Sequence, residues 1–377
     1  MHVAVHDSLR GDPVLGEDAP QRFQATRFND AGQALDAMGL PCLDVACPHC
    51  RRKFPPGFLD VPYHIISLVG DQSAGKSYYL SVMAKVFPAS LYRHFGVTCQ
   101  DADPTGNAPL NDMKSVLFSA QSPEQARLAK TQLEGAMYER LPRHGRMVAL
   151  PKPFVYSLRG NHGGDSACSL IFYDNAGEHF QPGRDVTEQP GALHVASAAG
   201  ILFLFDPFNS PEFRKCIGRT DDPQMEKPAI DQQDVILSEM RSRIQKIRNL
   251  RSGEKIPTPL AVLVGKCDAW LHLLEGGPLV HPLANGALSS DAIHINSRRI
   301  REFLVSACPT VVANAEALSE RVVFFAVSAF GHTPVKVAGN AYVPDPARLA
   351  PVQVEVPPLW LLSQISPGLL QATETTA

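Results

Sequence analysis

The order of apolar and polar positions along the chain predicts an α/β fold. Five apolar stretches, Ile65–Val69, Ser169–Asp174, Gly200–Asp206, Leu260–Gly265 and Val322–Val327, contain few polar residues. Such near-continuous runs are typical of parallel strands that helices bury on both faces. Helical patterns separate most of these runs, so we expect right-handed crossovers in an open, doubly wound sheet.

Helices and one antiparallel strand complete the predicted architecture. The stretch Pro153–Arg159 is predicted to be a further strand, which a glycine-rich turn joins to Ser169–Asp174 as a hairpin. We therefore expect six strands, all parallel except for this one at the edge of the sheet. Helices are predicted over Lys76–Phe87, Gln232–Leu250, Ser297–Ala307, Asn314–Glu320 and Glu355–Ile365.

The pattern also divides the chain into a large sheet domain with smaller parts around it. Residues 1–40 lack a sustained period, which predicts a weakly ordered lead-in with one short helix near Gln33–Met38. Residues 41–60 carry clustered cysteines, and residues 61–367 are expected to form the sheet domain. A disordered tail is expected over residues 368–377.

One connection within the sheet domain is unusually long. Between Ser77 and Asp174 the sequence contains turn signals at Asp103-Pro104-Thr105-Gly106 and a helical stretch over Ser122–Tyr138. We expect an enlarged, mobile insertion here.

Composition narrows the class of protein. The 377 residues carry a formal net charge of −3 and a sequence pI near 6.5, which argues against a broad electrostatic grip on nucleic acid or an anionic membrane. No apolar run approaches the length that spans a bilayer, and the first residues lack the apolar core of a signal peptide. We therefore expect a soluble, cytoplasmic protein.

The basic stretch from Arg241 to Lys255 is explained by a solvated helix face, with a docking surface as the alternative.

Three of the eight cysteines cluster before the sheet domain. The C-x₂-C spacing of Cys47 and Cys50 lets two thiolates occupy neighbouring corners of a Zn²⁺ tetrahedron, and Cys42 is the candidate third ligand. The alternative is a cysteine knuckle that has lost its metal and keeps reduced thiols. A fourth zinc ligand would come from His64, His6 or His2.

The most specific motif lies between the first predicted strand and helix. Residues 70–77 read GDQSAGKS, a complete G-x-x-x-x-G-K-S phosphate loop. In this arrangement backbone N–H groups and the helix N-terminus converge on phosphates, Lys76 reaches the β- and γ-phosphates, and the Ser77 hydroxyl binds Mg²⁺. A simple helix-capping turn is the alternative, but both glycines, the lysine and the serine are in register. The residues expected to contact a nucleotide here are Gly70, Asp71, Gln72, Ser73, Ala74, Gly75, Lys76, Ser77 and Tyr78.

A second motif, Asp174-Asn175-Ala176-Gly177-Glu178, follows the strand Ser169–Asp174. The Asp174 carboxylate, adjacent in the sheet to the phosphate loop, can hold Mg²⁺ through a water molecule. Gly177 lets a backbone N–H approach the γ-phosphate. Paired with the phosphate loop, this motif is more than an ordinary Asp-Asn turn.

Two further motifs indicate which base is bound. Asp268, at the end of Gly265-Lys266-Cys267-Asp268, can accept hydrogen bonds from both N1–H and N2–H₂ of guanine, a pair of donors that adenine does not offer. The stem of Lys266 can lie along the base. Ser328 and Ala329 follow the last strand, where a backbone N–H can bond the guanine O6. Since open α/β sheets bind ligands at the carboxyl ends of strands, the four motifs predict one guanine nucleotide site.

These motifs, in this order, resemble the Ras-like branch of the TRAFAC-class phosphate-loop GTPases, over residues 62–366. The resemblance implies a GTP-binding molecular switch with Mg²⁺-dependent hydrolysis of GTP to GDP. It also implies that Lys76, Gly177 and Glu178 are catalytic and that Lys266 and Asp268 read guanine, although Gly265 departs from the usual first residue of that motif. The preceding cysteines are similar to those of paired GTPases of prokaryotic conflict systems. This implies a second GTPase or another protein effector as partner, whereas nucleic acid is unexpected because of the charge of the chain.

Two departures from the family bear on the chemistry. Glu178 stands where many relatives carry a glutamine that orients the attacking water, and its negative charge is unfavourable near the γ-phosphate. We therefore expect slow intrinsic hydrolysis, raised by a partner or by a residue of the insertion. Thr105 and Thr131 are the candidates for the family's Mg²⁺-binding threonine. Loss of the γ-phosphate is expected to release residues 100–150 and 175–190.

Two other functions are consistent with the same motifs. The first is an ATPase of another phosphate-loop branch, in which the Gly265–Asp268 motif is incidental. The second is a scaffold or zinc-dependent interaction module that binds nucleotide without turnover. Competition of ATP with labelled GTP separates the first from a GTPase, and partner binding by a Lys76→Ala variant separates the second.

Overall fold

A computed structural model shows that the chain forms two compact units, Met1–Pro62 with Glu139–Leu150 and Tyr63–Tyr138 with Pro151–Ala377. The backbone is described for residues 1–128, 137–143, 146–160, 167–175, 180, 191–218, 220–229, 233–284 and 286–370. Side chains are described for these residues except 139–143, 146–149, 191–192 and 284.

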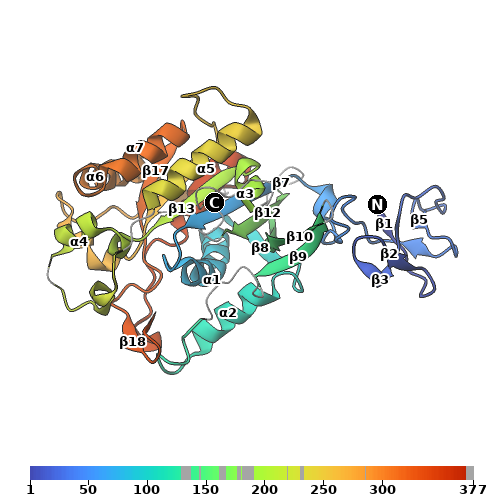
Figure 1. Ribbon diagram of the computed structural model, residues 1–377, viewed down its shortest axis with the longest axis horizontal. Helices are drawn as coiled ribbons and strands as arrows, with labels where there is room; N and C mark the ends of the chain where they lie inside the picture. The colour runs from blue at the N-terminus through green and yellow to red at the C-terminus, as the bar shows by residue number, and fades with distance from the viewer. Residues whose placement is uncertain are drawn as a thin grey trace, which may run out of the picture. The chain divides into compact units, whose positions relative to one another are not determined.

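A seven-stranded sheet forms the centre of the larger unit, in the order β17-β14-β13-β7-β12-β11-β8 (Figure 1). The five predicted parallel strands are confirmed, because β12, β7, β13, β14 and β17 pair in parallel. Every residue of β13 and β14 is buried, which explains their unbroken apolar sequences. The bounds are β7 Tyr63–Gly70, β8 Thr98–Asp101, β11 Pro153–Arg159, β12 Ala167–Asp174, β13 Gly200–Phe205, β14 Leu260–Val264 and β17 Val322–Ala326.

The carboxyl ends of the parallel strands align at one edge of this sheet. Asp174 of β12 lies opposite Leu68 of β7, and Leu204 of β13 lies opposite Gly70. Strands β13, β14 and β17 extend from β7 on one side, whereas β12 and β11 extend on the other. This reversal of strand order beside β7 is the place where open α/β sheets bind ligands.

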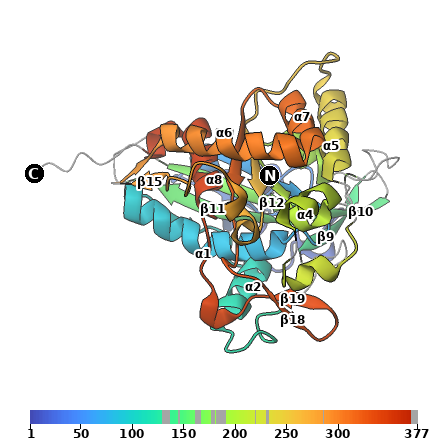
Figure 2. The ribbon, with the colours of Figure 1, turned by 90° about the vertical axis from the view of Figure 1, so that its left-hand side faces the viewer.

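Helices cover both faces of the sheet, which confirms the doubly wound arrangement. Figures 1 and 2 show α5, α6 and α7 on one face and α1 on the other. Ile201, Phe203 and Phe205 of β13 belong to the core beneath the first group of helices, whereas Gly200, of opposite parity, lies against Leu361 of α8. No helix within the described residues is long and apolar enough to cross a membrane. The helices are α1 Lys76–Phe95, α2 Ala108–Ser119, α3 Gly191–Ala196, α4 Pro211–Ile217, α5 Gln233–Arg248, α6 Ser290–Ala307, α7 Pro309–Leu318 and α8 Val356–Ile365.

The sheet has seven strands rather than the six that the sequence predicts. The additional strand is β8, whose sequence TCQD is too short and too polar to be recognised by its pattern. It pairs antiparallel with β11, which also pairs antiparallel with β12, as the predicted hairpin requires. The single antiparallel strand therefore lies one place inside the edge, and its prediction as the edge strand is wrong.

The insertion between β7 and β12 differs from the prediction. The helix predicted over Ser122–Tyr138 is wrong in its described part, since residues 121–128 form bends and turns and Tyr138 begins strand β9, Tyr138–Arg143. A helix that the sequence pattern did not predict, α2, lies in the described part of this region. Its lead-in contains the predicted turn, in which the Asp103 carboxylate accepts a hydrogen bond from the Gly106 N–H at 3.0 Å.

Short antiparallel strand pairs build the smaller unit, and residues 1–40 contain β1 to β5. The helix predicted near Gln33–Met38 is wrong, because Ala34 and Leu35 form β5, which pairs with β6. The Asp36 carboxylate is buried and accepts four backbone hydrogen bonds, which hold this segment in a non-helical conformation. Its donors are the N–H groups of Val5, His6, Met38 and Leu40. The strands are β1 His2–Val3, β2 Arg10–Asp12, β3 Gly16–Pro20, β4 Arg22–Phe23, β5 Ala34–Leu35 and β6 Pro41–Cys42, with β9 and β10 Arg146–Pro151 forming one further pair.

The packing of α8 on β13 predicts the effect of a single methyl group. In Gly200→Ala the added carbon would lie 3.0 Å from both terminal carbons of Leu361, which should lower the free energy of unfolding by roughly 1–2 kcal/mol. Urea unfolding of the full chain measures the loss. Gly368→Ala is the control, since nothing lies within 4 Å of its added carbon. Equal effects of the two substitutions would contradict this packing.

Candidate nucleotide-binding site

The phosphate loop connects β7 to α1, as the sequence predicts. Gly70 ends β7 where β13 passes so closely that a side-chain carbon would lie 2.6 Å from the Leu204 carbonyl oxygen. Ser73 and Gly75 adopt left-handed backbone conformations with φ of 65° and 96°, and Gly75 caps the N-terminus of α1. The loop thereby presents the positive end of a helix dipole, which favours a phosphate group.

Lys76 is almost fully buried and is bonded to the loop that it follows. Its Nζ donates to the carbonyl oxygens of Gly70 at 2.8 Å and Asp71 at 2.7 Å. The Asp71 carboxylate accepts a hydrogen bond from Asn209 Nδ2 at 3.0 Å, which ties the loop to the segment after β13. Burial raises the pKa of Asp71. The ammonium of Lys76 is therefore held in place for a charge-assisted bond to a phosphate.

Asp174 is a buried carboxylate without a hydrogen-bond partner among the described residues. It is 2% exposed, and neither of its carboxylate oxygens accepts a hydrogen bond there. Burial raises the pKa of Asp174, although the charge of Lys76 partly offsets this effect. An uncompensated buried carboxylate is costly, and carboxylate oxygens are ligands that Mg²⁺ prefers. Asp174 therefore fits a magnesium ion, together with Ser77 in the first turn of α1.

Lys266 is fixed by a carboxylate at the end of the neighbouring strand. Its Nζ lies 2.6 Å from Asp206 Oδ2, and the Asp206 side chain is 2% exposed. The same ammonium lies 5.3 Å from the centre of the Phe208 ring, close enough for a cation–π contact. The backbone of Lys266 is left-handed, with φ of 52°. These contacts hold the lysine stem in one position at the cavity.

Asp268 lies in the short 3₁₀ turn Cys267–Ala269 that follows β14. The ring N–H of Trp270 donates to the Gly265 carbonyl oxygen at 2.9 Å, so this hydrogen bond holds the first residue of the Gly265–Asp268 motif in place. Asp268 is half-buried and lines the cavity. Its carboxylate is therefore placed to accept hydrogen bonds from a ligand.

Ser328 organises the loop after the last strand of the sheet. Its hydroxyl oxygen accepts hydrogen bonds from the N–H groups of Phe330 at 3.3 Å and Gly331 at 2.8 Å. Its backbone exchanges two hydrogen bonds with Val352, of 2.8 and 3.0 Å. Ala329 lies within this constrained turn and lines the cavity.

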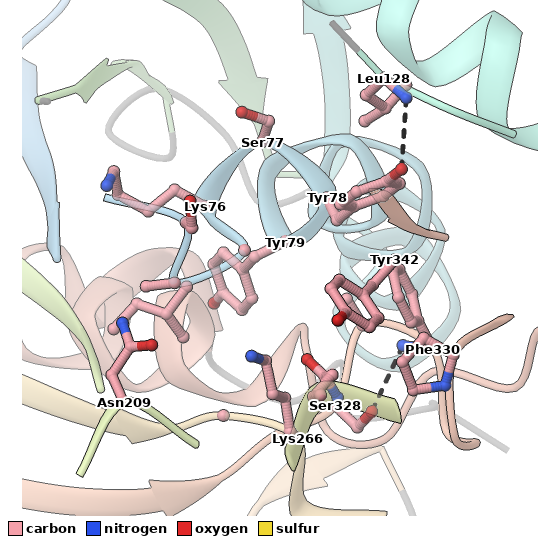
Figure 3. A pocket seen from close by; sticks show the side chains of 18 of the residues that line it. Lys76, Ser77, Tyr78, Tyr79, Leu128, Asn209, Lys266, Ser328, Phe330 and Tyr342 are labelled. Atoms are coloured by element: carbon pink, nitrogen blue, oxygen red, sulfur yellow. Dashed lines mark hydrogen bonds between the residues drawn. The ribbon is translucent and has the colours of Figure 1, made fainter. Parts of the chain in front are cut away.

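One cavity of about 750 Å³, within the size range of small-molecule sites, is lined by residues of three of the four motifs, namely the phosphate loop, the Gly265–Asp268 motif and the Ser328-Ala329 pair. Figure 3 shows Lys76 and Ser77 at the start of α1, with Lys266 and Ser328 across the cavity from them. Gly70 and Asp174 are not among the lining residues. The predicted residues that line the cavity are Asp71, Gln72, Ser73, Ala74, Gly75, Lys76, Ser77, Tyr78, Lys266, Asp268, Ser328 and Ala329.

Several predicted residues are not brought to this site. Thr105 is exposed in the turn before α2 and does not line the cavity. Gly177, Glu178 and Thr131 lie outside the described residues. Their expected roles in hydrolysis and Mg²⁺ binding stay predictions.

Sequence reasoning missed residues that complete the site. Asp206 carries a recognisable signal, because it ends a buried strand as Asp174 does. Tyr342 carries none, since it lies on the hairpin β18 Val335–Val337 and β19 Ala341–Val343, outside any motif. Other lining residues that no motif identified include Tyr79, Arg127, Leu128, Asn209, Lys227, Phe330 and His332.

The three clustered cysteines of the smaller unit are not brought together as metal ligands. Cys42 is buried in β6, with its Sγ 3.6 Å from the Leu40 carbonyl oxygen, whereas Cys47 and Cys50 follow in a separate turn. Burial and the charge of Asp36 raise the pKa of the Cys42 thiol. In the described part of the chain, no three His, Cys, Asp or Glu side chains group to hold a metal ion. The expected set of Cys42, Cys47 and Cys50 is therefore not assembled.

The basic stretch of α5 is partly structural. Arg243 is 3% exposed, pairs with Glu239 at 3.0 Å and lies over the Phe180 ring. Arg248 donates a hydrogen bond to the Ala196 carbonyl oxygen at 2.7 Å. These two arginines hold α5 on the core, so they are not part of a simple solvated face.

The Asp174 carboxylate has no hydrogen-bond partner among the described residues, and this predicts an unusual response to substitution. The pKa of Asp174 in the folded protein is raised above the ordinary value of 3.8, which applies to the unfolded chain. The free energy of unfolding therefore falls as the pH rises from the unfolded-state pKa to the folded-state pKa, and it stays lower at higher pH, where Asp174 is ionised. Asp174→Asn should therefore raise the free energy of unfolding of the nucleotide-free protein at pH 7, by on the order of 1 kcal/mol. Urea unfolding between pH 4 and pH 8 measures this difference.

Asp206→Asn is the matched control for this substitution. Asp206 is equally buried but is paired with Lys266, so the change should destabilise the protein. A loss of stability in both variants at pH 7 would contradict the description of Asp174 as uncompensated.

No protein-family model matches the chain, and no curated protein matches it. Among solved structures it is similar to Sup35 complexed with GDP, at 10% identity over 76% of this chain and 41% of that one, with a TM-score of 0.28. It is also similar to the Ski7 GTPase-like domain of S. cerevisiae bound to GTP (12% identity, 84% and 52% covered, TM-score 0.32). A third is Era in complex with MgGDPNP and nucleotides 1506–1542 of 16S ribosomal RNA, at 13% identity over 71% of this chain and 52% of that one, with a TM-score of 0.25. The chain spans about half of these chains or less. Likenesses this loose carry no inference, so the description of the fold rests on the strand order and the site geometry.

Proposed function

We propose that the chain is a GTP-binding molecular switch that hydrolyses GTP with the help of Mg²⁺. The observation that supports this most is the single cavity lined by both the phosphate loop and the residues expected to read the base. Lys76 and Ser77 lie across the cavity from Lys266 (Figure 3), and Asp268 also lines it. A nucleotide needs a cationic site for its phosphates and a hydrogen-bonding site for its base, and this cavity offers both.

The base is proposed to be guanine. The half-buried Asp268 carboxylate accepts from N1–H and N2–H₂, and the turn around Ser328 and Ala329 offers a backbone N–H to O6. The Asp206 carboxylate fixes the Lys266 ammonium, so the lysine stem is held where it can lie along the base. Adenine lacks the donor pair and would leave Asp268 without partners, which disfavours it.

Ser77 and Asp174 are the residues that would hold Mg²⁺. The ion would supply the ligand bond that the buried Asp174 carboxylate lacks among the described residues, where neither of its oxygens accepts a hydrogen bond. When bound, it neutralises charge on the β- and γ-phosphate oxygens. Lys76 donates to the same phosphates from the start of α1.

Hydrolysis is proposed to be slow in the isolated chain. Gly177 would offer its N–H to the γ-phosphate, and Glu178 would stand near the attacking water. Glutamate accepts but does not donate hydrogen bonds to the transferring group, so a partner would supply what is missing. We place the chain in the Ras-like branch, with a second GTPase of a conflict system or another effector as that partner.

The choice of base is tested by Asp268→Asn. This variant should bind GTP about 100-fold more weakly, because one acceptor becomes a donor facing the guanine N–H groups. Equilibrium binding of labelled GTP, with ATP as competitor, measures this. Asp222→Asn is the control, because Asp222 lies near Asp268 but does not line the cavity. Effective competition by ATP, or equal binding by Asp268→Asn, would favour an ATPase instead.

The rate of hydrolysis is tested in steady state. The isolated chain should turn over GTP at on the order of 10⁻³ s⁻¹ or slower, and Glu178→Gln should raise this at least about tenfold. Lys76→Ala sets the background, and Glu320→Gln, an exposed glutamate outside the cavity, is the matched control. Fast turnover by the unmodified chain would contradict the assignment of Glu178. Tight GTP binding without any turnover, in the Glu178→Gln variant as well as in the unmodified chain, would favour the scaffold.

A further inference from the structure

Three segments that are distant in sequence meet beside the base-reading part of the cavity. They are the first turn of α1, residues 126–128, and the hairpin β18–β19 with the turn that leads into it. We propose that Tyr78, Arg127 and this hairpin form a clasp that retains bound nucleotide and sets the rate at which it dissociates. The clasp rests on the proposed function, because it acts on the nucleotide held there.

The Tyr78 hydroxyl is the first part of the clasp. It donates a hydrogen bond to the Ala126 carbonyl oxygen at 3.1 Å and accepts one from the Leu128 N–H at 3.2 Å. Figure 3 shows the second of these bonds reaching from α1 to Leu128. One side-chain atom, one residue after Ser77, therefore fixes two backbone groups of the insertion.

The Tyr78 ring connects the same helix to the base-reading loop. It packs against the Phe330 ring in an edge-to-face arrangement, with centroids 4.9 Å apart and an interplanar angle of 86°. Phe330 is in turn held by its N–H bond to the Ser328 hydroxyl. Tyr78 thus contacts both the insertion and the loop that is proposed to read guanine.

Arg127 fastens the insertion to the hairpin. Its guanidinium donates to the Ala338 carbonyl oxygen, in the turn between β18 and β19, at 3.1 Å. In strand β19 of the same hairpin, the centre of the Tyr342 ring lies 4.1 Å from the Lys227 ammonium in a cation–π contact. The hairpin is therefore held by contacts from two other segments of the chain.

The clasp residues also line the cavity, which links their contacts to ligand release. Tyr78, Arg127, Phe330 and Tyr342 all contribute to its wall. A nucleotide bound between the phosphate loop and Asp268 lies beside these residues, and its departure requires them to separate. Weakening the clasp should therefore speed dissociation more than it changes association.

Dissociation of radiolabelled GDP from the full chain, chased with excess unlabelled GDP, tests this inference. Tyr78→Phe keeps the ring against Phe330 but removes both hydroxyl bonds, and should raise the dissociation rate about tenfold. Arg127→Met should raise it by a smaller factor. The association rate should change less than about threefold in both variants. Because the two residues belong to one clasp, the double variant should show less than the product of the single effects.

Tyr79→Phe is the matched control. It removes a buried tyrosine hydroxyl that donates to the Val354 carbonyl oxygen at 3.0 Å, on the next residue of the same helix and outside the clasp. Because Tyr79 also lines the cavity, this variant should lower the urea midpoint of the nucleotide-free protein but speed GDP dissociation less than Tyr78→Phe does. Equal acceleration by Tyr79→Phe and Tyr78→Phe would overturn the clasp, because general loosening of α1 would explain both.

The outcomes separate the clasp from the proposed function. Tight GDP binding with an unchanged rate in Tyr78→Phe overturns the clasp and leaves the guanine site standing. Binding of ADP in place of GDP overturns the guanine assignment, and the clasp is then measured with ADP. Binding of neither nucleotide by the unmodified chain overturns both.

Discussion

The site depends on one constraint, the burial of β7 between two parallel neighbours under helices on both faces. Strands in such a position tolerate few polar side chains along their length, so polar groups collect where the strands end. Parallel pairing then brings those ends to a single edge, with Asp174 beside β7 and Gly70 beside Leu204. The close approach at Gly70, where a side-chain carbon would lie 2.6 Å from a carbonyl oxygen, fixes the exit direction of the phosphate loop.

The charges gathered at this edge are unequally compensated. Lys76 is bonded to loop carbonyl oxygens and Lys266 to Asp206, so both cations are held before any ligand arrives. Asp174 has no such partner among the described residues. The held cations need little reorganisation when an anion binds, whereas the uncompensated carboxylate lowers the stability of the empty protein. A metal ion bound with the nucleotide would relieve this second effect, so folding stability and ligand binding are coupled at one side chain.

The predictable parts of the structure are those set by local pattern. Apolar runs identified the five parallel strands, and the motif at residues 70–77 identified the phosphate loop, because burial and loop geometry each require a recognisable sequence pattern. β8 has no such pattern, since a four-residue strand with one neighbouring strand needs no apolar run. The helix expected over Ser122–Tyr138 is absent from its described part, whereas α2, which the pattern did not predict, packs on α1. The bond of Tyr78 to Leu128, or of Asp206 to Lys266, depends on tertiary approach of separate segments and could not be predicted from either alone.

The position of β8 has a consequence for self-association. An open sheet edge offers unpaired backbone groups on which a strand from another molecule can add, and the first step toward fibrils is such an addition. Here the edge strand is only four residues long and ends in Asp101. That carboxylate is held by the side chains of Asn107 and Asn111, which lie at the start of α2. The insertion therefore protects this edge of the sheet, and a change that loosened α2 would expose it as a template for polymerisation.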